Sequence, residues 1–105
     1  MIGLMMLLAS GSGDFFYGND LYAGICGNSR HRLECALYVT GVVDMALTAA
    51  AVEKRNLPFC VPRNANVGQL GDVFRKELRD HPKRRHLRGA TLVYVSMRDA
   101  FPCAV

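Results

Sequence analysis

The chain contains no tryptophan, only four prolines, and no internal repeat or low-complexity segment among its 105 residues. Half of the residues are hydrophobic and 21% are charged, which excludes a chain that is disordered throughout. No uninterrupted apolar run reaches the roughly 20 residues that a membrane-spanning helix needs. At this length we expect one domain with a modest core, and no stable membrane insertion.

The motifs of common catalytic and metal sites are missing as well. The four cysteines form no Cys-x-x-Cys pair, which leaves a zinc or thioredoxin-like site without support. No Gly-x-Ser-x-Gly turn presents a nucleophile. His31, His81 and His86 have no fixed helical spacing or added carboxylates for a metal. We therefore expect no enzyme, no cofactor and no metal.

The four cysteines themselves, Cys26, Cys35, Cys60 and Cys103, favour two disulfides in an oxidising compartment over free buried thiols. The first residues bear on the same question. Residues 1–9 are apolar and precede a small polar run at 10–13, like the second half of a secretory signal. The usual positive leader is missing, so the true start lies upstream or the segment is a core strand or helix. We expect residues 1–13 to be a remnant of an export signal or an apolar segment, and residues 14–105 to be the single helical domain.

Start and stop signals predict four helices. The first begins at Gly18-Asn19-Asp20 and ends near 27–28, and the longest covers about 32–54. Asn66 and Gln69 match a capping box that starts the third helix, which ends before His81-Pro82. A fourth covers about 89–101, although residues 91–95 also have strand propensity. The expected fold is all-α: a small four-helix, disulfide-stapled bundle.

Apolar spacing predicts which faces are buried. The long helix has two overlapping apolar stripes, so we expect burial on more than one side, at the centre of the bundle. The expected inward residues are Leu33, Leu37, Val42, Met45 and Ala49, widened by Ala36, Val39, Val43 and Ala46, and on the last helix Ala90, Val93, Met97, Ala100 and Phe101. Asp44 lies inside this apolar helix and is expected to be a structural acid bonded to a neighbouring helix end or loop. Gly41 is expected to allow a close helix approach.

The helix order selects one disulfide pairing. A tight turn brings Cys26 and Cys35 together, while Cys60 lies past the far end of the long helix, roughly 25–30 Å from Cys35. The last two helices form a hairpin that returns Cys103 towards Cys60. Because bridged Cα atoms lie within about 7 Å, the pairs Cys26–Cys35 and Cys60–Cys103 are expected.

The net charge of +4 is concentrated in one segment near the expected hairpin loop. The basic residues there are Lys83, Arg84, Arg85 and Arg88, with His86 among them. Such a cluster is compatible with an acidic partner protein, with salt-sensitive nucleic-acid binding, or with a solvated loop. No recognition-helix pattern or stacking aromatic accompanies it. We expect a protein partner and no nucleic acid.

Several segments together resemble one family, the periplasmic type VI secretion immunity proteins of the Tai/Rap group, which are similar in fold to the acid chaperone HdeA. The segments that carry the resemblance are Gly18-Asn19-Asp20-Leu21, Cys35-Ala-Leu-Tyr38, Gly41-Val-Val-Asp44-Met-Ala, Phe59-Cys60-Val-Pro62, Asn66 to Val73, Asp80-His81-Pro82, Arg85-His86 and Ala100-Phe101-Pro102-Cys103. They extend over about residues 18 to 103, and their order and spacing are more specific than any single piece.

The resemblance implies an exported, disulfide-containing helical protein of a Gram-negative periplasm. Relatives bind and block secreted peptidoglycan amidase effectors, often as homodimers, through the loop between the last two helices. Carried onto this chain, the partner-binding residues are Lys83, Arg84, Arg85, His86 and Arg88. The alternatives are an exported HdeA-like chaperone or protein-binding module without a toxin partner, and a basic nucleic-acid-binding domain with reduced thiols.

Overall fold

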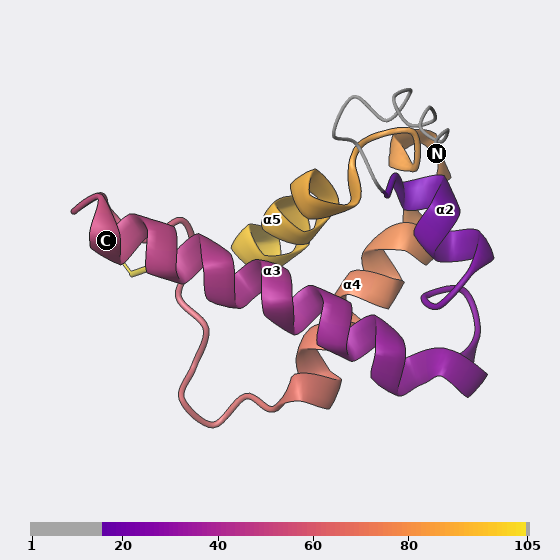
Figure 1. Ribbon diagram of the computed structural model, residues 1–105, viewed down its shortest axis with the longest axis horizontal. Helices are drawn as coiled ribbons and strands as arrows, with labels where there is room; N and C mark the ends of the chain where they lie inside the picture. The colour runs from indigo at the N-terminus through magenta and orange to yellow at the C-terminus, as the bar shows by residue number, and fades with distance from the viewer. Residues whose placement is uncertain (1–15, 105) are drawn as a thin grey trace, which may run out of the picture.

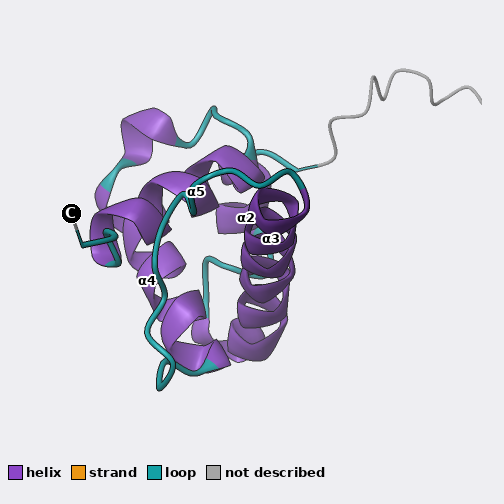
Figure 2. Ribbon diagram, turned by 90° about the vertical axis from the view of Figure 1, so that its left-hand side faces the viewer, coloured by secondary structure: helices purple, strands orange, loops and turns teal. Residues whose placement is uncertain are grey.

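The computed structural model describes residues 16–104, and the expectations for residues 1–13 lie outside them. Four α-helices and two short 3-10 helices make up the described part, with no strand in it (Figures 1 and 2). Their bounds are α2 Gly18–Ala23, η1 Ser29–His31, α3 Arg32–Val52, α4 Val67–Asp80, η2 Pro82–Arg84 and α5 Gly89–Ala100. The all-α prediction is confirmed, and residues 91–95 are helical, not extended.

The bundle is organised around α3 and α4, with α5 packed against both (Figure 1). Figure 2 shows α3 on one side of the molecule and α4 and α5 on the other, joined by the long loop 53–66. Fully buried side chains from all sides meet between them: Phe59, Phe74, Leu78, Leu92, Met97, Val39, Val93 and Cys35. This core is small, as expected for a chain of this length.

Local signals set the helix ends. Asn66 accepts a hydrogen bond from the Gln69 amide, and the Gln69 side chain accepts one from the Asn66 amide, both at 2.8 Å. This capping box satisfies two amides that the first turn of α4 would leave without partners. Lys54, with φ 55°, adopts the left-handed conformation just beyond the C-terminus of α3.

The buried face of α3 agrees with only part of the expected one: Ala36, Val39, Val43 and Ala46 are buried as expected. Its buried residues are Cys35, Ala36, Val39, Val43, Ala46 and Ala50. The side chains expected to lead the core face outward instead: Leu33 is 64% exposed, Leu37 56% and Met45 65%. The prediction of burial on more than one side was wrong, because α4 and α5 cover only one face of α3 and leave the other apolar stripe in solvent.

The last helix shows a similar difference. Leu92, Val93, Ser96 and Met97 are buried, whereas Ala90 and Ala100 are exposed and Phe101 is half-buried. Since α5 packs on both α3 and α4, its buried face is wide enough to hold two pairs of adjacent residues, Leu92 with Val93 and Ser96 with Met97. The alanines at its two ends lie outside this face. Sequence spacing alone located Val93 and Met97 correctly but missed Leu92.

A close contact between α3 and α4 occurs at Gly71. A Cβ added there would lie 2.8 Å from the Ala36 Cβ and 2.9 Å from its Cα, too near for any side chain to fit without a shift. The close approach expected at Gly41 is not found among residues 16–104, since none of their atoms outside the helix lies within 4 Å of a Cβ built there. Asp44 is exposed, so its carboxylate is solvated and makes no buried structural contact.

An ion pair reinforces the same helix crossing. The Arg32 guanidinium donates to both Asp72 carboxylate oxygens, at 3.0 and 2.6 Å. These hydrogen bonds hold the pKa of the Asp72 carboxyl below its usual value. Because both side chains are about half exposed, the pair fixes the orientation of the two helices more than it adds stability.

Two disulfides close the chain. Cys26 is bonded to Cys35 with Cα atoms 5.0 Å apart, and Cys60 to Cys103 with Cα atoms 4.8 Å apart. These are the pairs that the helix order predicted. The first joins the segment after α2 to the start of α3, and the second joins loop 53–66 to the end of α5.

Segment Ser29–Val52 is long and apolar enough, by length and composition alone, to cross a membrane, with a mean hydropathy of 1.7. Central helices of soluble bundles meet the same criterion. Only 33% of its most apolar window is buried in this structure, so α3 carries more apolar surface than its packing within residues 16–104 covers.

The two glycines give a matched test of the helix crossing. Gly71→Ala should lower the free energy of unfolding by about 1–3 kcal/mol, because the new methyl group meets the Ala36 backbone. Gly41→Ala, in open space on an exposed helix face, should raise it by about 0.5–1 kcal/mol through helix propensity. Urea denaturation at low protein concentration measures both. Equal effects of the same sign would contradict the contact at Gly71.

Candidate functional site

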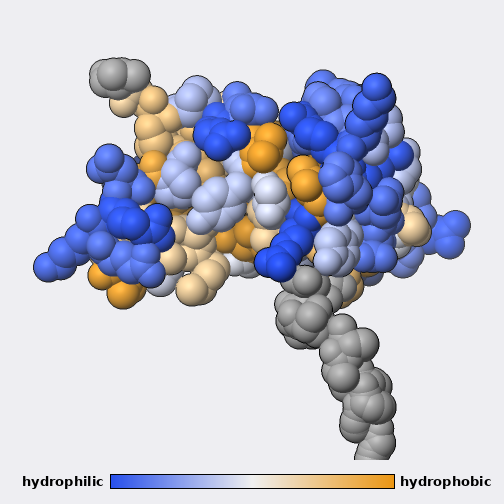
Figure 3. All heavy atoms as spheres, turned by 90° about the horizontal axis from the view of Figure 1, so that it is seen from above, coloured by the Kyte–Doolittle hydropathy of each residue, from blue (hydrophilic) through white to orange (hydrophobic). Residues whose placement is uncertain are grey.

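The predicted partner-binding residues lie on one loop, residues 81–88, which connects α4 to α5 and contains η2. The loop lies at the end of the molecule that also carries α2 (Figure 1). Seen from above, this end is largely hydrophilic, whereas apolar residues interrupt the surface elsewhere (Figure 3). The sequence therefore placed the basic residues correctly on a connection between helices.

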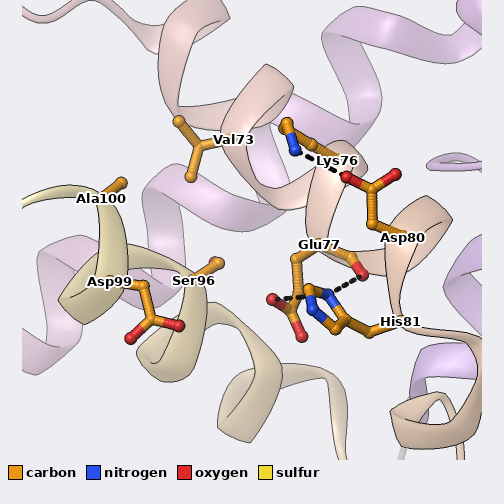
Figure 4. Close-up of a pocket in the computed structure, with 8 residues that line it drawn as sticks. All are labelled: Val73, Lys76, Glu77, Asp80, His81, Ser96, Asp99 and Ala100. Atoms are coloured by element: carbon orange, nitrogen blue, oxygen red, sulfur yellow. Dashed lines mark hydrogen bonds and ion pairs between the residues drawn. The ribbon is translucent and has the colours of Figure 1, made fainter.

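Arg84 is only partly exposed and forms an ion pair within the domain. Its guanidinium lies 3.0 Å from Oε2 and 3.2 Å from Oε1 of Glu77, a carboxylate that is only 6% exposed. The His81 ring lies against the same residue, with Nδ1 3.4 Å from Oε1 (Figure 4). A carboxylate removed from water needs such partners, so Arg84 is a structural counter-ion as well as a loop residue.

Arg85 is also turned inward. Its Nε donates to the Leu78 carbonyl at 2.6 Å and a terminal nitrogen donates to the Arg79 carbonyl at 3.3 Å. The guanidinium carbon lies 3.6 Å from the centre of the Tyr22 ring, a cation–π contact with α2. Arg85 thus donates hydrogen bonds to carbonyl groups at the C-terminal end of α4 that the helix itself leaves without partners, and it joins that end to α2.

Backbone hydrogen bonds fasten the loop and the start of α5 to Phe16 and the first residues of α2. The Gly18 amide donates to the Leu87 carbonyl at 2.8 Å, and the Asn19 amide to the Arg85 carbonyl at 2.7 Å. In return, the Gly89 amide donates to the Phe16 carbonyl at 2.9 Å. The loop is therefore ordered on two sides, by α4 below it and by residues 16–19 beside it.

The remaining predicted residues face outward. Lys83, His86 and Arg88 are exposed, and His86 Nδ1 lies 3.0 Å from the Lys83 carbonyl oxygen. The structure thus divides the five residues into two groups: Arg84 and Arg85 hold the loop, and Lys83, His86 and Arg88 form its outer surface. Sequence reasoning missed Glu77 and Tyr22, because their partners are seven and 63 positions away in the chain.

A cavity of about 230 Å³ opens between α4 and α5 beside this loop, and its walls include the Glu77–His81 pair (Figure 4). Its polar lining residues are Lys76, Glu77, Asp80, His81, Ser96 and Asp99. Lys76 is bonded to Asp80 at 2.6 Å and the Ser96 hydroxyl to the Val93 carbonyl at 3.0 Å, so much of this polar surface is already engaged. Residues 16–104 hold no group of three side chains placed to bind a metal.

A second hollow, of about 520 Å³, lies between α3 and α5 and is mostly apolar. It is lined by Leu37, Tyr38, Gly41, Val42, Met45, Ala46, Ala49, Ala90 and Tyr94. These residues include Leu37 and Met45 of the exposed stripe of α3 described above. The chain therefore presents two distinct surfaces, a basic ordered loop and an apolar helix face.

The sequence profile of the Rap1a immunity proteins matches residues 17–103, which include all four helices, the basic loop and both disulfides. The chain belongs to the Rap1a immunity protein family. No curated protein and no solved structure matches it. Membership of the family indicates a protein that binds a secreted effector, a class that generally acts without catalysis. The two disulfides are consistent with a periplasmic or extracellular location.

Neighbouring loop residues give a matched test of the Arg84–Glu77 pair. Arg84→Glu should lower the free energy of unfolding by about 2 kcal/mol, because it leaves the buried Glu77 carboxylate beside a like charge. Lys83→Glu, the same charge reversal on an exposed side chain, should change it by less than about 0.5 kcal/mol. Thermal and urea unfolding of both variants measure the difference. Equal stability of the two would show that Arg84 is only a surface residue.

Proposed function

We propose that this protein neutralises a secreted type VI effector, a peptidoglycan amidase, by covering its active site in the periplasm. The observation that carries the proposal is the family match across the whole described domain together with the ordered basic loop. The proposal includes the Tai/Rap subgroup, an HdeA-like arrangement of the helices, and action by binding without catalysis. Both disulfides suit a protein that works after export.

The outer surface of the loop suits an acidic, concave partner. Lys83 and Arg88 place positive charge at the tip of the α4–α5 hairpin, and complementary charge speeds encounter and selects the partner. The loop is already held by Arg84, Arg85 and residues 16–19, so little conformational entropy is lost when it enters a cleft.

Charge reversal at the tip tests this role. Lys83→Glu with Arg88→Glu should slow association with the effector about tenfold or more at low salt, and should leave the helical content unchanged. Stopped-flow or surface plasmon resonance kinetics measure the rate, and survival of cells that express the effector measures protection. Lys54→Glu with Arg63→Glu is the matched control, because it reverses two exposed charges in loop 53–66.

Two results would contradict the proposed role. Unchanged association of the Lys83→Glu/Arg88→Glu variant would remove the loop from the binding surface. Preferential capture of many unfolded proteins in acid, with no single partner at neutral pH, would indicate a chaperone of the HdeA kind.

We also propose that the protein is a homodimer, formed through the exposed apolar face of α3. This face carries Leu33, Leu37, Met45 and Val52 at one-turn or two-turn spacing, and each side chain is more than half exposed. Gly41 lies in the middle of the stripe with open space around it. Two copies of α3 can therefore approach closely where they cross, with Leu37 and Met45 of each filling the apolar hollow of the other.

Sedimentation equilibrium tests the homodimer. Leu37→Glu with Met45→Glu should raise the dimer dissociation constant at least about tenfold, because two charges are buried against apolar surface. Leu57→Glu with Val67→Glu, which changes two exposed apolar residues off this face, should leave it unchanged. A wild-type chain that stays monomeric at high concentration would refute the proposal, as would equal weakening by both double variants.

A further inference from the structure

The proposed binding loop depends on α2, and α2 is too short to be stable by itself. It has six residues, whereas isolated helices in water need about 12–15 to be even marginally stable. Its only buried side chain is Leu21, which enters the core. Contacts beyond its own hydrogen bonds must therefore keep it in place.

One of these contacts is covalent. Cys26 follows α2 by three residues, is 2% exposed, and is bonded to the fully buried Cys35 in the first turn of α3. The Cys26 amide also donates to the Leu21 carbonyl at 2.8 Å, so the cysteine and the helix end form one unit. The disulfide thus anchors the C-terminal side of α2 to the helix on which the core is built.

The other side of α2 touches the loop. The Gly18 and Asn19 amides donate to the carbonyls of Leu87 and Arg85, and the Tyr22 ring lies against the Arg85 guanidinium. The fit at Gly18 is close, because a Cβ there would lie 2.7 Å from the Arg85 carbonyl oxygen. A continuous set of contacts therefore runs from Cys35 through Cys26 and α2 to the loop.

We infer that the Cys26–Cys35 disulfide sets the α4–α5 loop in its binding geometry, so that the chain becomes competent to bind its effector only after oxidation. The inference rests on the function proposed above for this loop. Before oxidation, α2 keeps its noncovalent contacts with the core, chiefly those of Leu21 and Tyr22, but loses its covalent anchor to α3. The loop then rests on a less firmly held partner on one of its two sides. The protein would then stay inactive in a reducing compartment and gain its activity after export.

The oxidation of the two thiols needs a partner that accepts two electrons, and a disulfide-bonded oxidoreductase supplies it. The Cys26 and Cys35 thiols each lose a proton and together lose two electrons, and one S–S bond forms between them. The electrons and protons pass to the disulfide of a thiol–disulfide oxidoreductase, which is released as a dithiol. Because both cysteines are buried, the bond is protected from small reductants once the domain has folded. Formation of the Cys26–Cys35 disulfide is therefore a single event in the maturation of the protein.

The second disulfide gives a matched control within the same chain. Cys60–Cys103 lies where α5 ends, whereas the loop lies where α5 begins. It joins loop 53–66 to the C-terminal segment, and the Cys60 amide donates to the Phe101 carbonyl at 2.8 Å. Removing it should loosen that end of the molecule and leave the contacts of α2 with the α4–α5 loop in place.

Amide hydrogen exchange of two double variants tests the inference without any effector. In Cys26→Ser/Cys35→Ser, the amides of Asn19, Leu87 and Gly89 should exchange about tenfold faster or more than in the wild type, while those of Val39 and Phe74 in the core keep their protection. In Cys60→Ser/Cys103→Ser, the three amides should stay protected. Trypsin should cut after Arg84, Arg85 and Arg88 faster in the first variant only.

A third variant tests the link between α2 and the loop with both disulfides intact. Gly18→Ala should also expose the loop amides, because its methyl group pushes against the Arg85 backbone. If Cys26→Ser/Cys35→Ser does not fold in buffer, the exchange is measured in a stabilising osmolyte, which favours the compact chain. An unfolded chain there would overturn the inference, since the bond would then be a general folding requirement.

The remaining outcomes are also decisive. Protected loop amides in Cys26→Ser/Cys35→Ser would overturn the inference, as would equal loss of loop protection in both double variants. A loop that loses its protection while affinity for the effector stays at the wild-type value would uphold the disulfide's effect on the loop and refute the loop as the binding surface. That result separates failure of the proposed function from failure of this inference.

Discussion

The close contact of α3 with α4 is the constraint on which the rest of the structure depends. Gly71 lets the two backbones approach at Ala36, and the buried Val39, Phe74 and Leu78 of the same two helices belong to the core. Because α4 crosses α3 at this point, α5 can pack against both helices and the α4–α5 loop reaches the end where α2 lies. A larger residue at position 71 would displace α4 and, with it, the base of the loop.

Because α4 and α5 cover α3 from one side, an apolar face of α3 remains on the surface. A helix with apolar residues on two faces can bury only one of them in a bundle of this size, since surface is large relative to volume in small domains. The uncovered face, centred on Gly41, is an apolar surface that the described part of the chain leaves exposed. Its cost in solubility is offset if a second copy covers it.

The arginines of the loop illustrate how one residue type takes two roles. Arg84 and Arg85 are held by Glu77, by helix-end carbonyls and by Tyr22, while Lys83 and Arg88 lie on the outer surface. The inward pair converts a charged connection into an ordered one. Planar guanidinium groups suit that task because they donate in several directions at once and also stack on aromatic rings.

The sequence by itself determined the number and order of the helices, the capping box of α4, the two disulfide pairs and the position of the basic loop. Each of these depends on neighbours in the chain or on simple distances along helices, as Asn66 with Gln69 and Cys26 with Cys35 show. The sequence did not determine the end of α2, which lies at Ala23 and not near residues 27–28. The tertiary structure alone decided which stripe of α3 is buried, because Leu37 and Val39 are equally apolar and only the position of α4 separates them. It also decided that Asp44 is solvated, and that Glu77 and Tyr22 receive Arg84 and Arg85, since those contacts form only after distant segments have packed.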